Sequence, residues 1–435
     1  MVVLTPELMI MKHSDTDDLV AKAKAAKLAS RSLGKTDSKV KNDALLKIAS
    51  ALSFRRAEIL EANEIDVNIA RQSGMDEALL DRLVLNKQRL ESNARDIEVV
   101  ASLPDPIGES FDQRVLPNGL QVSRRRVPIG VIGAIYESRP NVTLDISALC
   151  IKSGNSVILR GGREAIRTNS TLSRIVRDSI SEAGVSEECV QFVESTDRSI
   201  VDYMLQMKEY IDLMIPRGGA DFIKFIGANA KMPVVTGGVG VCHTYVDSRA
   251  DLNDAVPIVI NAKVQRPTVC NALDTLLVHE DVARDYLPRV AVEMDRNGVV
   301  LHCDEQSMEI LGDLNLPSLS PSTEEDWGKE FLSLTAAVKI VKSLDEALEH
   351  IERYGSGHSE AIITEDYRSA MRFLNEVDAA VVYVNASTRF TDGGELGLGA
   401  EVAISTNKLH ARGPMGLREL TSYKWIILGN GQVRV

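Results

Sequence analysis

The stretch Gly130–Val142 reads GVIGAIYESRPNV, and the rest of the chain is best interpreted outward from it. Its first half is a continuous apolar run, which predicts a strand buried on both faces, as parallel strands are. Its second half is polar and places Arg139 and Asn141 directly after the strand. Ligands bind at the carboxyl ends of parallel strands, so these two side chains are candidates for a site. An ordinary polar turn is the alternative interpretation.

Apolar runs continue to alternate with helical patterns on the carboxyl side of this stretch. SVILR, CVQFVE, IDLMI, PVVTGG and CHTYVD are the expected strands of a first sheet, and DTLLVHE, VVLHC, LTAAVKIV, EAIIT and AVVYVN those of a second beginning near Ala250. Before Gly130, the first hundred residues show the apolar spacing of helices. A chain of 435 residues exceeds one ordinary core. The sequence therefore predicts an α/β fold with two doubly wound domains.

A hairpin is expected around Pro117-Asn118-Gly119, which lies between two short extended runs. The triplet Arg124-Arg125-Arg126 puts charge on both faces of the second run. This pattern fits a solvated edge strand, or a strand that pairs with another subunit. A last strand is expected at WIIL, near the carboxyl end.

Composition excludes several classes of protein. Acidic residues exceed basic ones by 62 − 50 = 12, which argues against nucleic acid as a main partner. No apolar run is long enough to span a membrane, and the first 18 residues lack the basic leader of a signal peptide. The five cysteines are odd in number and far apart, which disfavours disulfides and cysteine zinc sites. No H-x-x-x-H spacing occurs, so we expect no metal. Because the sequence shows no membrane span and no leader, we expect a cytoplasmic protein.

Cys270, in the segment QRPTVCN, differs from the other thiols in its context. It follows Pro267 and precedes the polar Asn271, at a join between a helix and a strand. Backbone N–H groups at such a join lower the pKa of a thiol and make it a nucleophile. A small buried core residue is the competing interpretation.

Several arginines stand beside a Gly, a Pro or a strand end, in a chain that is acidic as a whole. Such placement favours anion recognition, because the guanidinium group matches phosphate and carboxylate. Solvation of loops explains any one of them but explains all five less well. They are Arg139, Arg160, Arg217, Arg266 and Arg389.

Taken together, the blocks GVIGAIYESRPNV, ILRGG, MIPRGG, NAKVQRPTVCNALDTLLVH and VNASTRFTDGGELGLGAE resemble the gamma-glutamyl phosphate reductases. These enzymes, also called glutamate-5-semialdehyde dehydrogenases, form a family within the aldehyde dehydrogenase superfamily. The resemblance runs from about Asp18 to Trp425. It implies an aldehyde-dehydrogenase-like fold and NADPH-dependent reduction of L-glutamyl 5-phosphate to the semialdehyde, the second step of proline biosynthesis, through a cysteine thioester.

The resemblance also implies roles for individual residues and segments. Cys270 falls on the nucleophile and Asn141 on the oxyanion-hole amide. The residues expected to bind NADP(H) are Arg160, Gly161, Gly162, Arg217, Gly218, Gly219 and Glu330, and those expected to bind substrate are Arg139, Arg266, Ser387 and Arg389. The expected domains are 1–113 with 128–248 for NADP, 249–400 for catalysis, and 114–127 with 424–435 as oligomerisation strands.

Val235 marks a departure from ordinary aldehyde dehydrogenases. Those enzymes carry a Glu there, two residues before a Gly pair, which activates water to hydrolyse the thioester. Its absence favours the reductase over a rival that oxidises another aldehyde. A non-catalytic partner of glutamate 5-kinase is a second alternative. We expect a homodimer or tetramer, with glutamate 5-kinase as a possible partner and no fused kinase segment.

Overall fold

The structure is a computed structural model that describes residues 13–237 and 239–434. The chain divides into two compact units. Unit 1 comprises Met1–Thr236, Gly397–Ala403 and Met415–Val435, and unit 2 comprises Gly237–Leu396 and Ile404–Pro414. The expectation about a leader peptide rests largely on residues 1–12, which lie outside the described range. No helix in the described part of the chain is long and apolar enough to cross a membrane.

Unit 1 is built on a four-stranded parallel sheet with the order β5-β4-β3-β6. The strands are β3 (Val131–Tyr136), β4 (Ser156–Gly161), β5 (Val190–Phe192) and β6 (Leu213–Arg217). Every residue of β3 and β4 is buried, which explains why their sequences are continuous apolar runs rather than alternating ones.

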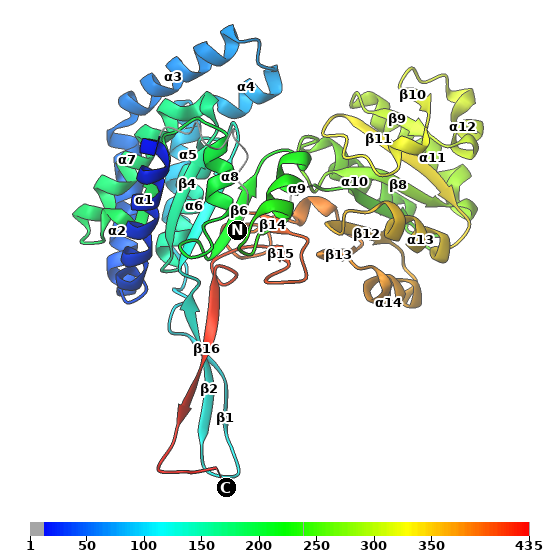
Figure 1. The fold of residues 1–435 in the computed structure, drawn as a ribbon. Helices are drawn as coiled ribbons and strands as arrows, with labels where there is room; N and C mark the ends of the chain where they lie inside the picture. The colour runs from blue at the N-terminus through cyan, green and yellow to red at the C-terminus, as the bar shows by residue number, and fades with distance from the viewer. Residues whose placement is uncertain (1–12, 238, 435) are drawn as a thin grey trace, which may run out of the picture. The chain divides into compact units, whose positions relative to one another are not determined.

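Helices cover both faces of this sheet. On one face, residues of α1 pack in one cluster with Val131 and Ile135 of β3. On the other, the Tyr136 hydroxyl lies 2.7 Å from the Thr143 hydroxyl of α6. The helices of unit 1, drawn in Figure 1, are α1 (His13–Leu33), α2 (Ser38–Phe54), α3 (Arg56–Gln72), α4 (Glu77–Leu83), α5 (Lys87–Ser102), α6 (Asn141–Lys152), α7 (Ile166–Glu182), α8 (Ser199–Leu205) and α9 (Ala220–Asn229).

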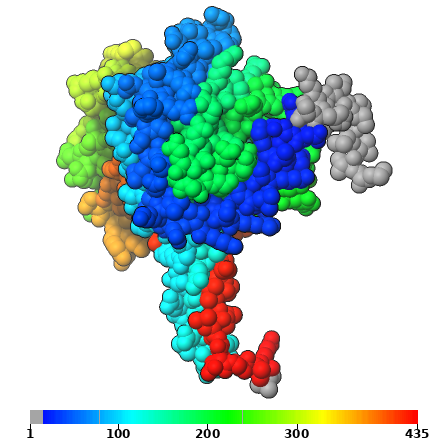
Figure 2. Space-filling model, turned by 90° about the vertical axis from the view of Figure 1, so that its left-hand side faces the viewer, coloured from blue at the N-terminus to red at the C-terminus, as the bar shows by residue number. Residues whose placement is uncertain are grey.

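A three-stranded antiparallel ribbon also belongs to unit 1. It consists of β1 (Ser110–Val115), β2 (Gln121–Pro128) and β16 (Thr421–Leu428), in that order. Figures 1 and 2 both show β2 and β16 side by side. Arg124 pairs across the strands with Trp425, and its guanidinium carbon lies 4.6 Å from the centre of the Trp425 ring. In this ribbon the predicted last strand, β16, pairs with β2, the second strand of the predicted hairpin.

Unit 2 contains a seven-stranded parallel sheet with the order β10-β9-β11-β8-β7-β12-β13. The strands are β7 (Cys242–Val246), β8 (Leu273–His279), β9 (Val300–Cys303), β10 (Leu319–Pro321), β11 (Thr335–Val341), β12 (Ser359–Ile363) and β13 (Val381–Val384). The helices are α10 (Leu252–Val264), α11 (Glu280–Arg296), α12 (Glu305–Leu311), α13 (Leu344–Tyr354) and α14 (Tyr367–Glu376). A two-stranded pair, β14 (Ile404–Ser405) and β15 (Gly413–Pro414), completes it.

Two expected strands differ from the prediction. CHTYVD forms β7, which pairs with β8 and β12 in unit 2 instead of closing the first sheet. The described residues of PVVTGG, 233–237, form no named strand, and an isolated parallel bridge pairs Val234 with Met214. Unit 2 accordingly begins at Gly237, twelve residues before the expected boundary. The helix α12 was not predicted, because its seven residues are too few to show a period.

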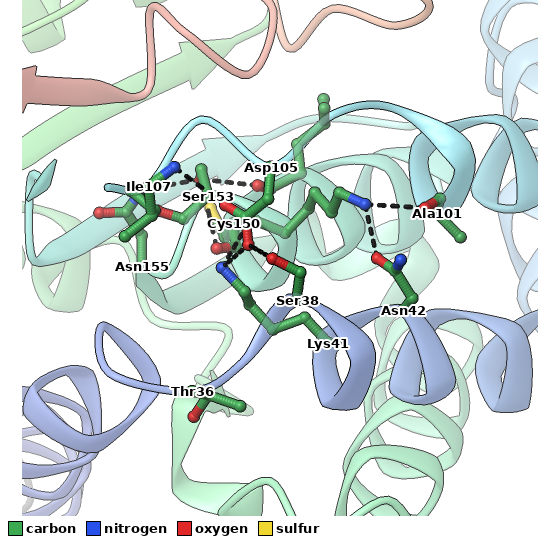
Figure 3. Close-up of polar contacts among 12 residues, drawn as sticks. Thr36, Ser38, Lys41, Asn42, Ala101, Asp105, Ile107, Cys150, Ser153 and Asn155 are labelled. Carbon is green, nitrogen blue, oxygen red and sulfur yellow. Dashed lines mark hydrogen bonds and ion pairs between the residues drawn. The ribbon is translucent and has the colours of Figure 1, made fainter. Parts of the chain in front are cut away.

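A buried polar cluster joins three helical segments of unit 1 (Figure 3). Lys41 of α2 forms an ion pair with Asp105 and donates to the Lys152 carbonyl oxygen at 3.1 Å. Lys152 donates to the Ala101 carbonyl oxygen at 2.7 Å. Both lysines are 1% exposed, so each ammonium group needs these partners to remain buried.

Candidate active site

The sheet of unit 1 reverses its direction of growth at β3 and β6. From β3 the chain goes on to β4 and β5 on one side, and then returns to place β6 on the other. At such a reversal, the loops that follow the two neighbouring strands leave a crevice for ligands. The turn 137–140 follows β3 and leads into Asn141, and Gly218-Gly219 follows Arg217 at the end of β6, so the structure brings Arg139, Asn141 and the second Gly pair to one edge of the sheet.

Two carboxylate side chains at this edge accept hydrogen bonds from backbone N–H groups. Glu137 accepts a hydrogen bond from the Gly219 N–H at 3.3 Å, at the start of α9. Glu164 accepts from the Ser138 N–H at 2.6 Å and from its hydroxyl at 2.8 Å. Ser138 has φ of 42°, a left-handed conformation that is costly for a residue other than glycine. Glu164 therefore stabilises the turn that carries Arg139 and Asn141.

Arg160 lies at the end of β4 and is only 8% exposed. Its Nη2 donates to the Thr196 carbonyl oxygen at 3.4 Å, while its buried Nε has no hydrogen-bond partner among the described residues. Burial lowers the pKa of the guanidinium group, and the nearby Glu164 opposes that change. An orphaned cationic donor beside Gly161 and Gly162 is suited to an anionic group.

Asn141 is the first residue of α6, and its side-chain amide donates to Asp145 one turn further along at 2.9 Å. Burial raises the pKa of Asp145 to about 6, and the hydrogen bond from Asn141 opposes the rise. The bond fixes which end of the Asn141 side chain carries the N–H groups. One of the two amide hydrogens stays available for another acceptor.

In unit 2 the candidate residues gather at the amino edge of the sheet. Cys270 lies between α10 and β8, Gly240 precedes β7, and Glu330 precedes β11. A Cβ on Gly240 would lie 1.5 Å from the Cys270 carbonyl oxygen, so only glycine fits there. The Gly240 N–H donates to Glu330 at 2.9 Å, which links this predicted cofactor ligand to the Cys270 segment.

Cys270 is the most accessible of the five thiols. It is partly exposed, whereas Cys150, Cys189, Cys242 and Cys303 are buried, and no disulfide is present. The thiol of Cys242 lies beneath it, with Sγ 3.2 Å from the Cys270 carbonyl oxygen. Exposure distinguishes a reactive thiol from a structural one.

Two arginines flank this cysteine. Arg266 is exposed, four residues before Cys270, and Arg389 is half-buried in the short helical turn η6 (Thr388–Phe390). Burial lowers the pKa of Arg389, and the positive charge of Arg266 lowers it further. Ser387 is buried and caps that turn by accepting from the Arg389 N–H at 3.3 Å. Arg389 thus interacts electrostatically with Arg266, with Asp392 and with the Cys270 thiol.

Sequence reasoning missed the residues that hold these groups in place. Gln265 accepts from the Arg389 Nε at 2.7 Å, and Asn271 donates to backbone carbonyls of the same turn. Their positions beside Arg266 and Cys270 are visible in the sequence, but their bonds to the distant Arg389 turn are not. Within the described ranges, no group of three His, Cys, Asp or Glu side chains is arranged to hold a metal ion.

The two parallel α/β sheets and the partly exposed Cys270 are the features that comparison with known proteins can test. The model of the aldehyde dehydrogenase family matches residues 6–308, so the chain belongs to this family.

Within it, the chain groups with the gamma-glutamyl phosphate reductases. It is 57% identical over 417 residues to that enzyme from Dehalococcoides mccartyi, covering 96% of this chain and 98% of the relative. Identity to the enzyme of Clostridium tetani is 52% over 421 residues, with the same coverage. The crystal structure of the enzyme from Thermotoga maritima superposes with a TM-score of 0.93 at 50% identity, covering 96% of this chain and all of the other. The fold class predicted from the sequence is confirmed.

Proposed function

We propose that the protein reduces L-glutamyl 5-phosphate to L-glutamate 5-semialdehyde and phosphate, with NADPH as reductant and Cys270 as nucleophile. Family membership at 50–57% identity over nearly the whole chain supports the activity, the second step of proline biosynthesis. The observation that carries the assignment to residues is the partly exposed Cys270 between Arg266 and Arg389.

The chemistry begins at the thiolate. Cys270 attacks the acyl carbon and forms a C–S bond, and the C–O bond to phosphate breaks with its electron pair leaving on the phosphate. Phosphate needs charge neutralisation rather than a proton, which Arg266 and Arg389 provide. Asn141 donates to the oxyanion, and one such donor typically contributes a factor of about 10² to 10³ in kcat.

A nicotinamide cofactor, when bound, supplies the hydride that reduces the thioester carbon. Cys270 then leaves as the thiolate and releases the aldehyde. Val235 stands where a hydrolytic base would act and is buried and apolar. Its side chain takes no proton from water, so the chain has no group at this position to divert the thioester to the free acid.

Preference for NADP over NAD rests on Arg160. Its unpartnered Nε offers a charged donor suited to the additional phosphate on the adenosine ribose. The Gly161-Gly162 and Gly218-Gly219 pairs let a nucleotide approach the backbone closely. Glu330, near Cys270, is proposed to bind the nicotinamide ribose.

The ribbon of β1, β2 and β16 supports a homo-oligomer. Apolar side chains of β1 and β16 are exposed by 58–70%, namely Val115, Ile427 and Leu428, and exposed apolar side chains favour an interaction surface. We propose that these strands pair with another copy, in a dimer or a tetramer. We also propose a cytoplasmic location, which the five free thiols support because thiols persist in reducing compartments.

The test is the reverse reaction, oxidation of glutamate 5-semialdehyde, measured with NADP or NAD and with or without phosphate. The proposal predicts strict dependence on phosphate and a higher kcat/KM with NADP. Turnover in the absence of phosphate would support the rival, an aldehyde-oxidising enzyme that hydrolyses its thioester. Equal use of both cofactors would refute the role of Arg160.

A further inference from the structure

Asn271, the residue that follows Cys270, is bonded to the turn that carries Arg389. Its Nδ2 donates to the carbonyl oxygens of Arg389 at 3.3 Å and Thr391 at 2.9 Å. Its own carbonyl oxygen accepts from the Thr388 hydroxyl at 2.7 Å. Three hydrogen bonds therefore join Asn271 to three residues of the segment 388–391, which lies more than a hundred positions away in the chain.

The link is buried. Asn271 is 4% exposed, Thr388 is fully buried and Thr391 is 1% exposed. The Thr391 hydroxyl extends the network to the hydroxyls of Ser359, at 2.7 Å, and Tyr383, at 2.9 Å. Hydrogen bonds in such a buried network hold their geometry, because breaking one leaves a buried polar group unpaired.

Stability alone does not account for an amide at this position. The Oδ1 of Asn271 is buried and has no hydrogen-bond partner within the described part of the chain. An unpaired buried acceptor costs about 1–3 kcal/mol. The unpaired Oδ1 of Asn271 is thus unfavourable, while its Nδ2 orders the backbone of the Arg389 turn.

A second contact restrains the same arginine from the other side of Cys270. Gln265 accepts from the Arg389 Nε at 2.7 Å, and it lies five residues before the cysteine. The backbone of Arg389 is held by Asn271 and its guanidinium group by Gln265. Arg266 repels this guanidinium group and Asp392 attracts it, and the bond to Gln265 adds a directional restraint to these charges.

We propose that Asn271 is a positioning residue that holds Arg389 at a fixed place relative to Cys270 and so sets the affinity of the enzyme for phosphate. The inference rests on the proposed function, in which Arg389 binds the phosphate group. The effect of Asn271 reaches the reaction through the arginine.

The experiment measures the KM for phosphate in the reverse reaction for Asn271→Leu, Arg389→Ala and the double variant. Leu has nearly the shape of Asn and removes both donated bonds. The expected result is a KM for phosphate at least tenfold higher in each single variant, with the KM for the aldehyde changed less than twofold. In the Arg389→Ala background, Asn271→Leu should change the KM for phosphate by less than twofold, because the arginine it positions is gone.

Two further variants make the test decisive. Thr388→Val removes only the hydroxyl that donates to Asn271, and it tests the same link should Asn271→Leu not fold. Thr275→Val is the matched control, since Thr275 is a fully buried residue of β8 whose hydroxyl has no partner among the described residues. It should leave the KM for phosphate unchanged.

The outcomes separate the two proposals. If Arg389→Ala raises the KM for phosphate while Asn271→Leu and Thr388→Val do not, the positioning role is refuted and the proposed function stands. The positioning role would also be refuted if Asn271→Leu raised the KM for phosphate equally in the wild-type and Arg389→Ala backgrounds. If Arg389→Ala leaves the KM for phosphate unchanged, the phosphate site and this inference fail together.

Discussion

The Sγ atom of Cys242 lies 3.2 Å from the backbone carbonyl oxygen of Cys270, so two thiols of opposite character share one corner of unit 2. Cys242 is fully buried, and burial raises its pKa well above the ordinary value, with further contributions from Glu360 and Asp274. Cys270 is partly exposed.

Alkylation should therefore select Cys270. Burial raises the pKa of Cys189 to about 11 and that of Cys303 to about 12, so these thiols stay protonated near pH 8. Iodoacetamide at that pH should add one label per chain, located at Cys270 by peptide mass spectrometry. The Cys270→Ser variant should take up none. Labelling of Cys242 at a comparable rate would contradict this picture of the site.

The charge at the anion site gives a second prediction. Arg266→Ala should raise the KM for phosphate in the reverse reaction by roughly 10- to 100-fold, the worth of one charge-assisted hydrogen bond. The KM of Arg266→Lys for phosphate should lie between those of the wild type and Arg266→Ala, because Lys keeps the positive charge but cannot donate two parallel hydrogen bonds to the phosphate. Arg372, an exposed residue of α14 paired with Glu376 and Asp345, provides a control whose replacement by Ala should have no effect. If the KM of Arg266→Ala for phosphate equalled that of the wild type, Arg266 would not bind the phosphate group.

Asp145 should make stability depend on pH. Its pKa is raised from 3.8 to about 6 by burial and, to a smaller extent, by Asp96. Between these values the folded state binds more protons than the unfolded state, so the contribution of Asp145 to the free energy of unfolding falls as pH rises from about 4 to 6.

The Asp145→Asn variant lacks this titration. Relative to the wild type, its melting temperature should therefore rise between pH 5 and pH 7.5, as measured by thermal unfolding in buffers of equal ionic strength. An offset in melting temperature that is the same at both pH values would show that Asp145 titrates normally.

The buried cluster of Lys41, Asp105 and Lys152 gives a ranking of stabilities (Figure 3). Asp105→Asn leaves two buried cations without a counter-charge and should lower the free energy of unfolding by about 3–5 kcal/mol. Lys41→Met should cost less, because Lys152 still interacts favourably with Asp105. Urea denaturation of both variants measures the difference. If Lys41→Met lowered the free energy of unfolding more than Asp105→Asn does, then Lys152 would not be a sufficient counter-charge for Asp105.

Much of the fold could be predicted because the apolar runs are long and uninterrupted. The five strands expected after Ala250 appear as β8, β9, β11, β12 and β13, each within a residue or two of its predicted position. The assignment of CHTYVD to the first sheet was wrong, since local sequence determines that a segment is extended but not which strands it joins.

The site residues show a similar limit. Arg266 and Cys270 could be singled out from the sequence because their types and neighbours are unusual. Asn271 could not be, because its role depends on bonds to residues 388–391, and no pattern in the sequence reports contacts between such distant segments. The roles of the predicted catalytic, cofactor and substrate residues remain proposals for experiment.

The most direct measurement is a burst of NADPH in the reverse reaction without phosphate. Cys270 adds to the aldehyde, oxidation gives the thioester, and no phosphate is present to release it. The account predicts formation of one NADPH per chain, no further turnover, and an acyl group on Cys270 detectable by mass spectrometry. Cys270→Ala should give no burst while binding NADPH normally. Continued turnover of the wild type without phosphate, or a burst from Cys270→Ala, would contradict the account.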